Sequence, residues 1–308
     1  EVIFAKLGLA IIDEQHRFGV HQRLALKEKA NHKVGQPHQL IMTATPIPRT
    51  LAMSAYADLD TSIIDELPPG RTPVSTVVID NSRRGQIVER VRNACLEGRQ
   101  TYWVCTLIEE SDTLEAQAAE ETCEQLSMAL PDLKVALIHG RMKPAEKEAI
   151  MAAFKANKID LLVATTVIEV GVDVPNASLM IIENAERLGL SQLHQLRGRV
   201  GRGRAASHCV LMYQAPLGQL GKQRLQIMRQ SSDGFVIAEK DLELRGPGEL
   251  LGTRQTGLMQ LRIANLERDG HLLEEVNAVA AQMISFHPQA VDPLIQRWIA
   301  DREQYAQV

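Results

Sequence analysis

Short apolar runs alternate with longer amphipathic stretches over the middle of this chain. Strands separated by helices of about ten or more residues predict βαβ units and a parallel sheet with helices on both faces. We therefore predict a doubly wound α/β domain over residues 70–215. Its strands are expected at 74–79, 102–107, 134–138, 160–163, 178–182 and 208–213, and its helices at 82–97, 112–130 and 144–154.

The first predicted helix shows how its apolar positions repeat. Ser82 opens it, Gly98 stops it, and the apolar residues between them recur on one face. Those residues are Ile87, Val88, Val91, Cys95 and Leu96. Trp103 and Trp298 also lie on apolar faces of their predicted elements, which favours core packing over stacking on nucleic-acid bases.

The N-terminal part departs from this pattern. Residues 1–66 offer two strand candidates, 7–12 and 39–42, with a helical stretch near 21–30, and the first residue is not Met. Two strands are too few for a self-sufficient parallel sheet, so we expect the chain to be a piece of a longer protein. Such a piece would expose an apolar edge, which makes self-association through residues 1–66 a hypothesis, although the longer protein is expected to be monomeric.

The C-terminal part is helical in pattern. The run at 68–73, Pro-Pro-Gly-Arg-Thr-Pro, predicts a linker, and helical spacing returns after about residue 216. Apolar residues repeat from His271 to Phe286, and Asp292-Pro293 is expected to cap a last helix. The expected domains are 1–66, 67–215 and 216–308, and the last of them is expected to be helical.

The amino-acid composition indicates the general class of this protein. A hydrophobic content of 45% and a charged content of 23% are typical of soluble globular proteins. No run of about 18 apolar residues predicts a membrane span, and the N-terminus lacks the features of a signal peptide. The four cysteines show no C-x-x-C spacing, which favours reduced, mostly buried thiols in a cytoplasmic protein.

Charge is distributed unevenly. The net charge is −4, yet residues 109–132 hold eight acidic residues and no Lys or Arg, whereas residues 194–230 hold seven Lys or Arg and no acidic residue. A local basic surface of this kind can bind an anion that the net charge does not reveal.

Two carboxylates, Asp13 and Glu14, follow the first predicted strand in the sequence Asp-Glu-Gln-His. The carboxyl ends of strands are where α/β sheets bind ligands. One carboxylate can hold Mg²⁺ while the other orients or deprotonates an attacking water, as nucleotide hydrolysis requires. A solvated strand end is the alternative interpretation.

Threonines follow two other predicted strands. Thr43 and Thr45 offer hydroxyls beside the Asp-Glu pair, although Pro46 also suits a simple turn. Thr165 and Thr166 suit the phosphates of a nucleic-acid backbone. In the segment after them, Gly171 permits close approach of a ligand and Asp173 can accept from a ribose hydroxyl, although G-x-D-x-P also forms ordinary turns.

Four arginines stand at Gly-spaced positions between residues 195 and 204. Their spacing does not fit an amphipathic core face, and arginine makes bidentate contacts to phosphate oxygens. An arginine that stabilises a transferring phosphoryl group accelerates the reaction by about 10³–10⁵. His139, after another strand, is expected to be a hydrogen-bonded structural histidine.

These segments resemble the later motifs of superfamily 2 helicases: 13–16 motif II, 43–45 motif III, 165–175 motif V and 195–202 motif VI. The surrounding sequence, above all residues 234–257 (GFVIAEKDLELRGPGELLGTRQTG), resembles the RecG family of DNA helicases over nearly the whole chain. The resemblance implies that residues 1–66 are the end of a first RecA-like domain and that residues 67–215 are a second one. It also implies an ATP-dependent translocase on duplex DNA that regresses stalled forks and migrates Holliday junctions in repair and recombination. Single-strand-binding protein is a further partner it suggests.

The resemblance also implies roles for individual residues. Asp13 would hold the Mg²⁺ of ATP, Glu14 would act on the attacking water, and Arg199 and Arg202 would be arginine fingers. The nucleotide cleft would include His16, Gly171, Asp173 and Gln195. Coupling would involve Thr43 and Thr45, and contact with DNA or translocation would involve Thr165, Thr166, Arg224, Arg245, Arg254 and Gln255.

No G-x-x-x-x-G-K-[ST] motif occurs in these 308 residues. We therefore expect these residues alone to lack ATPase activity, and the longer protein to possess it. The rival interpretations are a transcription-repair coupling factor, which shares the stretch at 234–257, and a non-catalytic nucleic-acid-binding module. The presence of Asp13, Glu14, Arg199 and Arg202 argues against the latter.

Overall fold

The computed structural model describes residues 7–13, 37–43, 60, 62–64, 66, 71, 73–106, 112–169, 174–203, 205–245 and 269–298. The chain forms two compact units. One consists of Glu1–Thr61 with Arg245–Val308, and the other is Ser62–Leu244.

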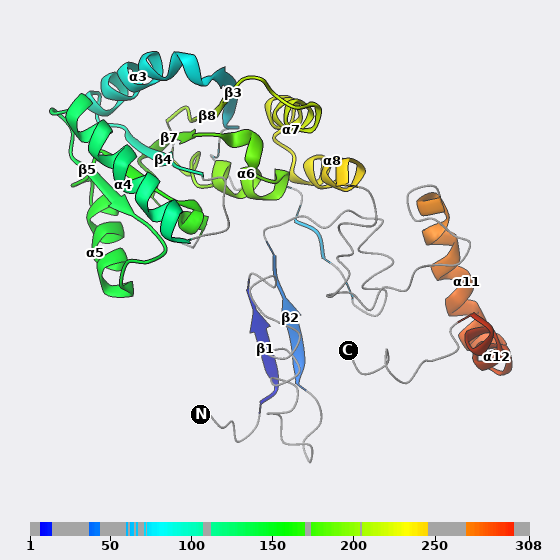
Figure 1. Ribbon diagram of the computed structural model, residues 1–308. Helices are drawn as coiled ribbons and strands as arrows, with labels where there is room; N and C mark the ends of the chain where they lie inside the picture. Colours follow the sequence, from blue (N-terminus) through cyan, green and yellow to red (C-terminus); the bar gives the residue numbers. More distant parts are fainter. Residues whose placement is uncertain are drawn as a thin grey trace. The chain divides into compact units, whose positions relative to one another are not determined.

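A six-stranded parallel sheet organises the larger unit, in the order β3-β8-β7-β4-β6-β5 (Figure 1). The strands are β3 (Ser75–Asp80), β4 (Gln100–Val104), β5 (Val135–Ile138), β6 (Leu161–Ala164), β7 (Ala177–Ile182) and β8 (His208–Tyr213). The three central strands β7, β4 and β6 are buried along their whole length. Continuous burial explains why β6 and β7 are almost entirely apolar, whereas β4 begins with the buried polar residues Gln100 and Thr101.

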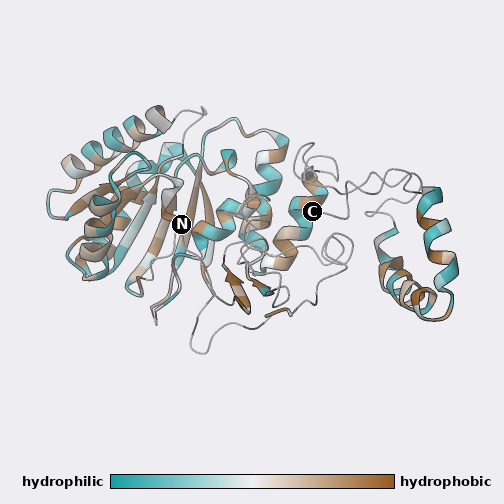
Figure 2. Cartoon of the chain, turned by 90° about the horizontal axis from the view of Figure 1, so that it is seen from below, coloured by the Kyte–Doolittle hydropathy of each residue, from teal (hydrophilic) through white to brown (hydrophobic). Residues whose placement is uncertain are grey.

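Helices cover both faces of this sheet, as the sequence predicts. Side chains of α3 (Arg84–Leu96) and α4 (Asp112–Ala129) pack on one face in a core around Trp103. Side chains of α5 (Pro144–Lys155), α6 (Leu190–Arg197), α7 (Gln219–Gln230) and α8 (Gly234–Arg245) pack on the other, around Tyr102 and Phe154. Hydrophobic residues dominate the strands, whereas the helices carry both kinds (Figure 2).

Several details of the larger unit differ from expectation. A 3-10 turn, η2 (Asn81–Arg83), precedes α3, and its N-cap is Asp80, whose carboxylate accepts from the Ser82 amide at 2.8 Å. The prediction that Leu96 faces the core is wrong, because its side chain is 56% exposed at the last position of α3. The compact unit also extends beyond the expected boundary at 215, because α7 and α8 share its core.

The cysteines are free thiols, and Cys95, Cys105 and Cys209 are buried. Burial raises the pKa of Cys105 and Cys209 to about 12.

Among the described residues, no helix is long and apolar enough to cross a membrane.

The two expected N-terminal strands are present as β1 (Leu9–Ile12) and β2 (His38–Ile41). They pair in parallel with Ile12 opposite Ile41. Leu9, Ile11 and Leu40 are each about half exposed or more, at 53%, 61% and 49%. The expected helix near residues 21–30 lies outside the described residues.

The C-terminal helices are η5 (Gly270–Leu272), α11 (Leu273–Phe286) and α12 (Pro288–Trp298). The helical pattern expected over residues 271–286 is therefore confirmed. The expected cap at Asp292-Pro293 is wrong, because α12 begins at Pro288 and contains Pro293 in its interior. Proline at the first position of a helix loses no hydrogen bond, and Pro288 supplies that start earlier in the chain.

Gln100 joins the sheet to the end of α5. Its side chain is fully buried, and Nε2 donates to the carbonyls of Phe154 at 2.6 Å and Ile159 at 2.7 Å. We predict that Gln100→Leu lowers the free energy of unfolding by about 1–3 kcal/mol, because a buried carbonyl loses its donor. A shift in the urea midpoint measures this. Gln226→Leu, at an exposed site on α7, is the matched control and should move the midpoint little; equal shifts would contradict the prediction.

Candidate nucleotide and nucleic-acid site

The arginine-rich stretch lies where α6 ends and the chain turns toward β8. We call residues 197–203 the arginine segment. Since β7 and β8 are parallel neighbours, the segment lies before the start of β8, and residues 174–176 lie before the start of β7. Both therefore lie at the amino-terminal edge of the sheet.

Arg197 anchors this segment and is buried, with 4% of its surface exposed. Its Nη1 donates to the carbonyls of Ser231 at 2.7 Å and Met228 at 3.0 Å, and to Thr76 Oγ1 at 3.4 Å. These partners lie on the turn after α7, on α7 and on β3. One guanidinium therefore ties the arginine segment to the α7–α8 pair and to the edge strand.

His194 completes the anchor. Arg197 Nη2 lies 3.1 Å from His194 Nδ1, and because a guanidinium has only donors, Nδ1 must accept. Burial, followed by the charge of Arg197, lowers the pKa of His194 to about 4. The imidazole is therefore neutral at pH 7, as the hydrogen bond requires.

The rest of the segment is shaped by its glycines. The Gly198 carbonyl accepts from Arg71 Nη2 at 3.3 Å and from Arg202 Nε at 3.2 Å. Gly201 is buried and has a φ of 80°, which favours glycine. Arg199 is half-buried, Arg202 is exposed and Gln195 is half-buried on α6. Arg199 and Arg202 therefore lie on either side of the buried Gly201, in a segment whose Gly198 carbonyl accepts hydrogen bonds from two arginines.

The threonine pair lies at the opposite, carboxyl-terminal edge of the sheet. Thr165 and Thr166 follow β6, and His139 follows the neighbouring strand β5. Thr165 is buried at 3% exposure, whereas Thr166 is half-buried, so Thr166 is the more accessible hydroxyl. His139 Nε2 lies 3.5 Å from Glu120 Oε1 on α4.

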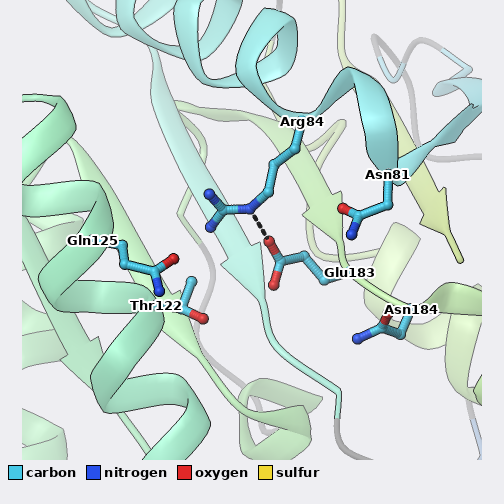
Figure 3. Close-up of a pocket in the computed structure, with 6 residues that line it drawn as sticks. All are labelled: Asn81, Arg84, Thr122, Gln125, Glu183 and Asn184. Carbon is cyan, nitrogen blue, oxygen red and sulfur yellow. Dashed lines mark hydrogen bonds and ion pairs between the residues drawn. The ribbon is translucent and has the colours of Figure 1, made fainter.

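A polar pocket of about 170 Å³ also opens at this edge (Figure 3). It is lined by Asn81, Arg84, Thr122, Gln125, Glu183 and Asn184. Arg84 Nε donates to Glu183 Oε1 at 2.7 Å, and the guanidinium lies 5.3 Å from the centre of the Trp103 ring.

The pocket lies where the sheet connections diverge. The strand β4 leads to α4 on one face and its neighbour β7 leads to α6 on the other, and sheets of this kind bind ligands in the crevice at such a point. Asn184 adopts left-handed backbone angles there, φ 47° and ψ 43°. Thr106 Oγ1 fixes that turn by donating to the carbonyls of Glu183 at 2.6 Å and Asn184 at 3.2 Å.

Arg224 lies on α7, where Nη1 donates to the Glu186 carbonyl at 3.5 Å. Glu186 belongs to η4 (Ala185–Arg187), the turn after β7, so this arginine helps to join α7 to the sheet. Arg245 is the last residue of α8, and its side chain lies outside the described residues, as do Arg254 and Gln255.

Asp13 and Thr43 lie at the carboxyl ends of β1 and β2, which are adjacent and parallel. The expected neighbourhood of these two segments is therefore confirmed. Glu14, His16, Thr45, Gly171 and Asp173 lie outside the described residues.

The fold is that of a helicase C-terminal domain: the helicase conserved C-terminal domain family matches residues 86–204. The family "ATP-dependent DNA helicase RecG, domain 3, C-terminal" matches residues 231–300. The chain belongs to the RecG family.

Individual relatives align with most or all of the chain. It is 67% identical over 307 residues to ATP-dependent DNA helicase RecG of Escherichia coli, covering 99% of this chain and 44% of that protein. It is 66% identical over 309 residues to the Pasteurella multocida protein of the same name, covering 100% of this chain and 45% of that one. The structure of RecG bound to a three-way DNA junction aligns with a TM-score of 0.67 and 43% identity, covering 89% of this chain and 34% of that one. The chain thus spans less than half of the length of these relatives.

Sequence reasoning missed the residues that support the site. Arg84 and Glu183 form the ion pair in the pocket, and Arg197 and His194 anchor the arginine segment. Glu183 follows an apolar strand directly, which could have signalled it. Arg197 carried no comparable signal, because an arginine in a Gly-rich stretch usually faces solvent.

His194 should make stability depend on pH. Its folded pKa of about 4 lies below the ordinary 6.5, so the unfolded chain binds more protons between these values. The free energy of unfolding should fall as pH drops from 6.5 toward 4, by roughly 1–3 kcal/mol from this group. In His194→Asn, Oδ1 still accepts from Arg197 but does not titrate. Urea unfolding across this range should show a shallower slope for the variant, and identical slopes would contradict the assignment.

Proposed function

We propose that this chain is the C-terminal motor portion of an ATP-dependent, double-stranded-DNA translocase that remodels stalled forks and Holliday junctions in repair and recombination. The proposal is carried by the arginine segment, whose position is fixed through Arg197 to the α7–α8 helix pair. The names of the relatives, ATP-dependent DNA helicase RecG, support it, and so does the structure of RecG bound to a three-way DNA junction.

The proposed nucleotide roles belong to the residues that match the helicase motifs. Asp13 holds Mg²⁺ and Glu14 orients the attacking water, while Arg199 and Arg202 are arginine fingers that stabilise charge on the transferring phosphoryl group. The nucleotide is also contacted by His16, Gln195, Gly171 and Asp173. The donor set fits: a carboxylate at a strand end is a suitable oxygen ligand for Mg²⁺, and guanidinium groups suit phosphate oxygens. ATP with Mg²⁺ supplies the transferable phosphoryl group.

In this proposal, hydrolysis of the nucleotide is coupled to movement along DNA. Thr43 and Thr45 respond to the state of the nucleotide, and Thr165 and Thr166 contact DNA phosphates at the carboxyl edge. Arg224, Arg245, Arg254 and Gln255 belong to the lever that moves along the duplex. In support, Arg197 gives the arginine segment a direct route to α7 and to the turn before α8. Binding through phosphates is independent of sequence and weakens with salt.

The test is DNA-stimulated ATP hydrolysis by the full-length protein on forked or four-way DNA. We expect Arg202→Ala to lower turnover by about 10³-fold or more and Glu14→Gln by about 10²–10⁴-fold. Affinity for DNA should change little, since many phosphate contacts share it. Arg90→Ala, which removes an exposed arginine on α3, is the matched control. Wild-type turnover in either site variant would contradict the role of that residue.

A further inference from the structure

Gly203, at the end of the arginine segment, lies against the backbone of the turn before β7. A Cβ atom at position 203 would lie 2.2 Å from the carbonyl oxygen of Pro175 and 3.2 Å from its carbonyl carbon. Real Cβ atoms essentially never show contacts under 3.0 Å. Any side chain at position 203 would therefore force one of the two backbones to move.

The Pro175 side of this contact is firmly held. Val174 is buried, and its carbonyl accepts from the Ala177 amide at 3.1 Å. The Asn176 carbonyl accepts from the Gln100 amide at 3.2 Å. Asn176 Nδ2 also donates to the Gly98 carbonyl at 3.0 Å and to Asn157 Oδ1 at 3.1 Å. The turn at 174–176 is thus fastened to β4 and to the turns that follow α3 and α5.

The arginine side of the contact lies nearer to solvent. Arg202 is exposed, and its Nε donates to the Gly198 carbonyl at 3.2 Å within the same segment. Arg202 precedes Gly203 directly. A side chain at position 203 would therefore move Arg202 rather than the Pro175 turn.

We propose that Gly203 is a positioning residue: its contact with Pro175 sets the place of Arg202 relative to the turn at 174–176. The inference rests on the proposed function, in which Arg202 acts on the nucleotide. Relief of a 2.2 Å contact requires a shift of about 1 Å, and a misplacement of this size can cost about 10²-fold in rate.

The experiment compares Gly203→Ala with Gly85→Ala in the full-length protein. A Cβ on Gly85 would meet nothing within 4 Å, so the second variant is the matched control. We expect Gly203→Ala to lower kcat for DNA-stimulated ATP hydrolysis by about 10–100-fold. The KM for ATP should change by less than about threefold, because the arginines act on charge that develops in the transition state. Gly85→Ala should keep wild-type kcat.

Rates are expressed per molecule that binds DNA, so a smaller folded fraction does not imitate the effect. An unchanged kcat in Gly203→Ala would overturn the inference. A rise in KM with kcat intact would overturn it as well, because the residue would then serve ground-state binding.

A double variant separates positioning from a general loss of structure. If Gly203 acts through Arg202, then Arg202→Ala with Gly203→Ala should be no slower than Arg202→Ala alone. Losses that multiply would overturn the inference. Full turnover in Arg202→Ala alone would overturn the proposed function itself, so the two failures are distinguishable.

Discussion

A guanidinium buried away from water determines how the elements around the arginine segment meet. Arg197 keeps its charge at any practical pH, and a buried charge is costly unless it is hydrogen-bonded. Within the described part of the chain its hydrogen bonds reach Met228 and Ser231 carbonyls, Thr76 and His194. Sheet, α6 and the end of α7 must therefore keep one arrangement, since moving any of them would leave donors unsatisfied in the interior. Arg199 and Arg202 follow Arg197 in the same segment.

The residues of the candidate site lie at two opposite edges of the sheet. The arginine segment and the Pro175 turn lie at the amino edge, while Thr166, His139 and the pocket around Arg84 lie at the carboxyl edge. The helix α6 spans the distance between them, because it starts after β7 and ends at the arginines. A short helix, rather than a loop alone, therefore connects the two edges.

Hydrophobic pattern alone predicted the parallel sheet and its helices on both faces, since burial dictates those features. The adjacency of Asp13 and Thr43 followed from their positions after two predicted strands. Features that depend on competition between tertiary contacts were not predictable. Leu96 fits the apolar face of α3 by spacing but lies at its last position, beyond the sheet. Pro293 looked like a helix start, yet Pro288 provides one earlier. Arg197 looked solvent-facing, and only the carbonyls brought to it by α7 make its burial tolerable.

The edge strand β3 has a consequence for how the larger unit forms during synthesis. Its neighbour in the sheet is β8, with Ser75 opposite His208 and Asp80 opposite Tyr213. The first strand of the unit is thus completed by the last one, and β3 stays without its ladder until the ribosome has released the segment up to Tyr213. Pairings between such distant segments form slowly. An unpaired strand edge invites association with other chains in the meantime, so this unit is most exposed to misassembly late in translation.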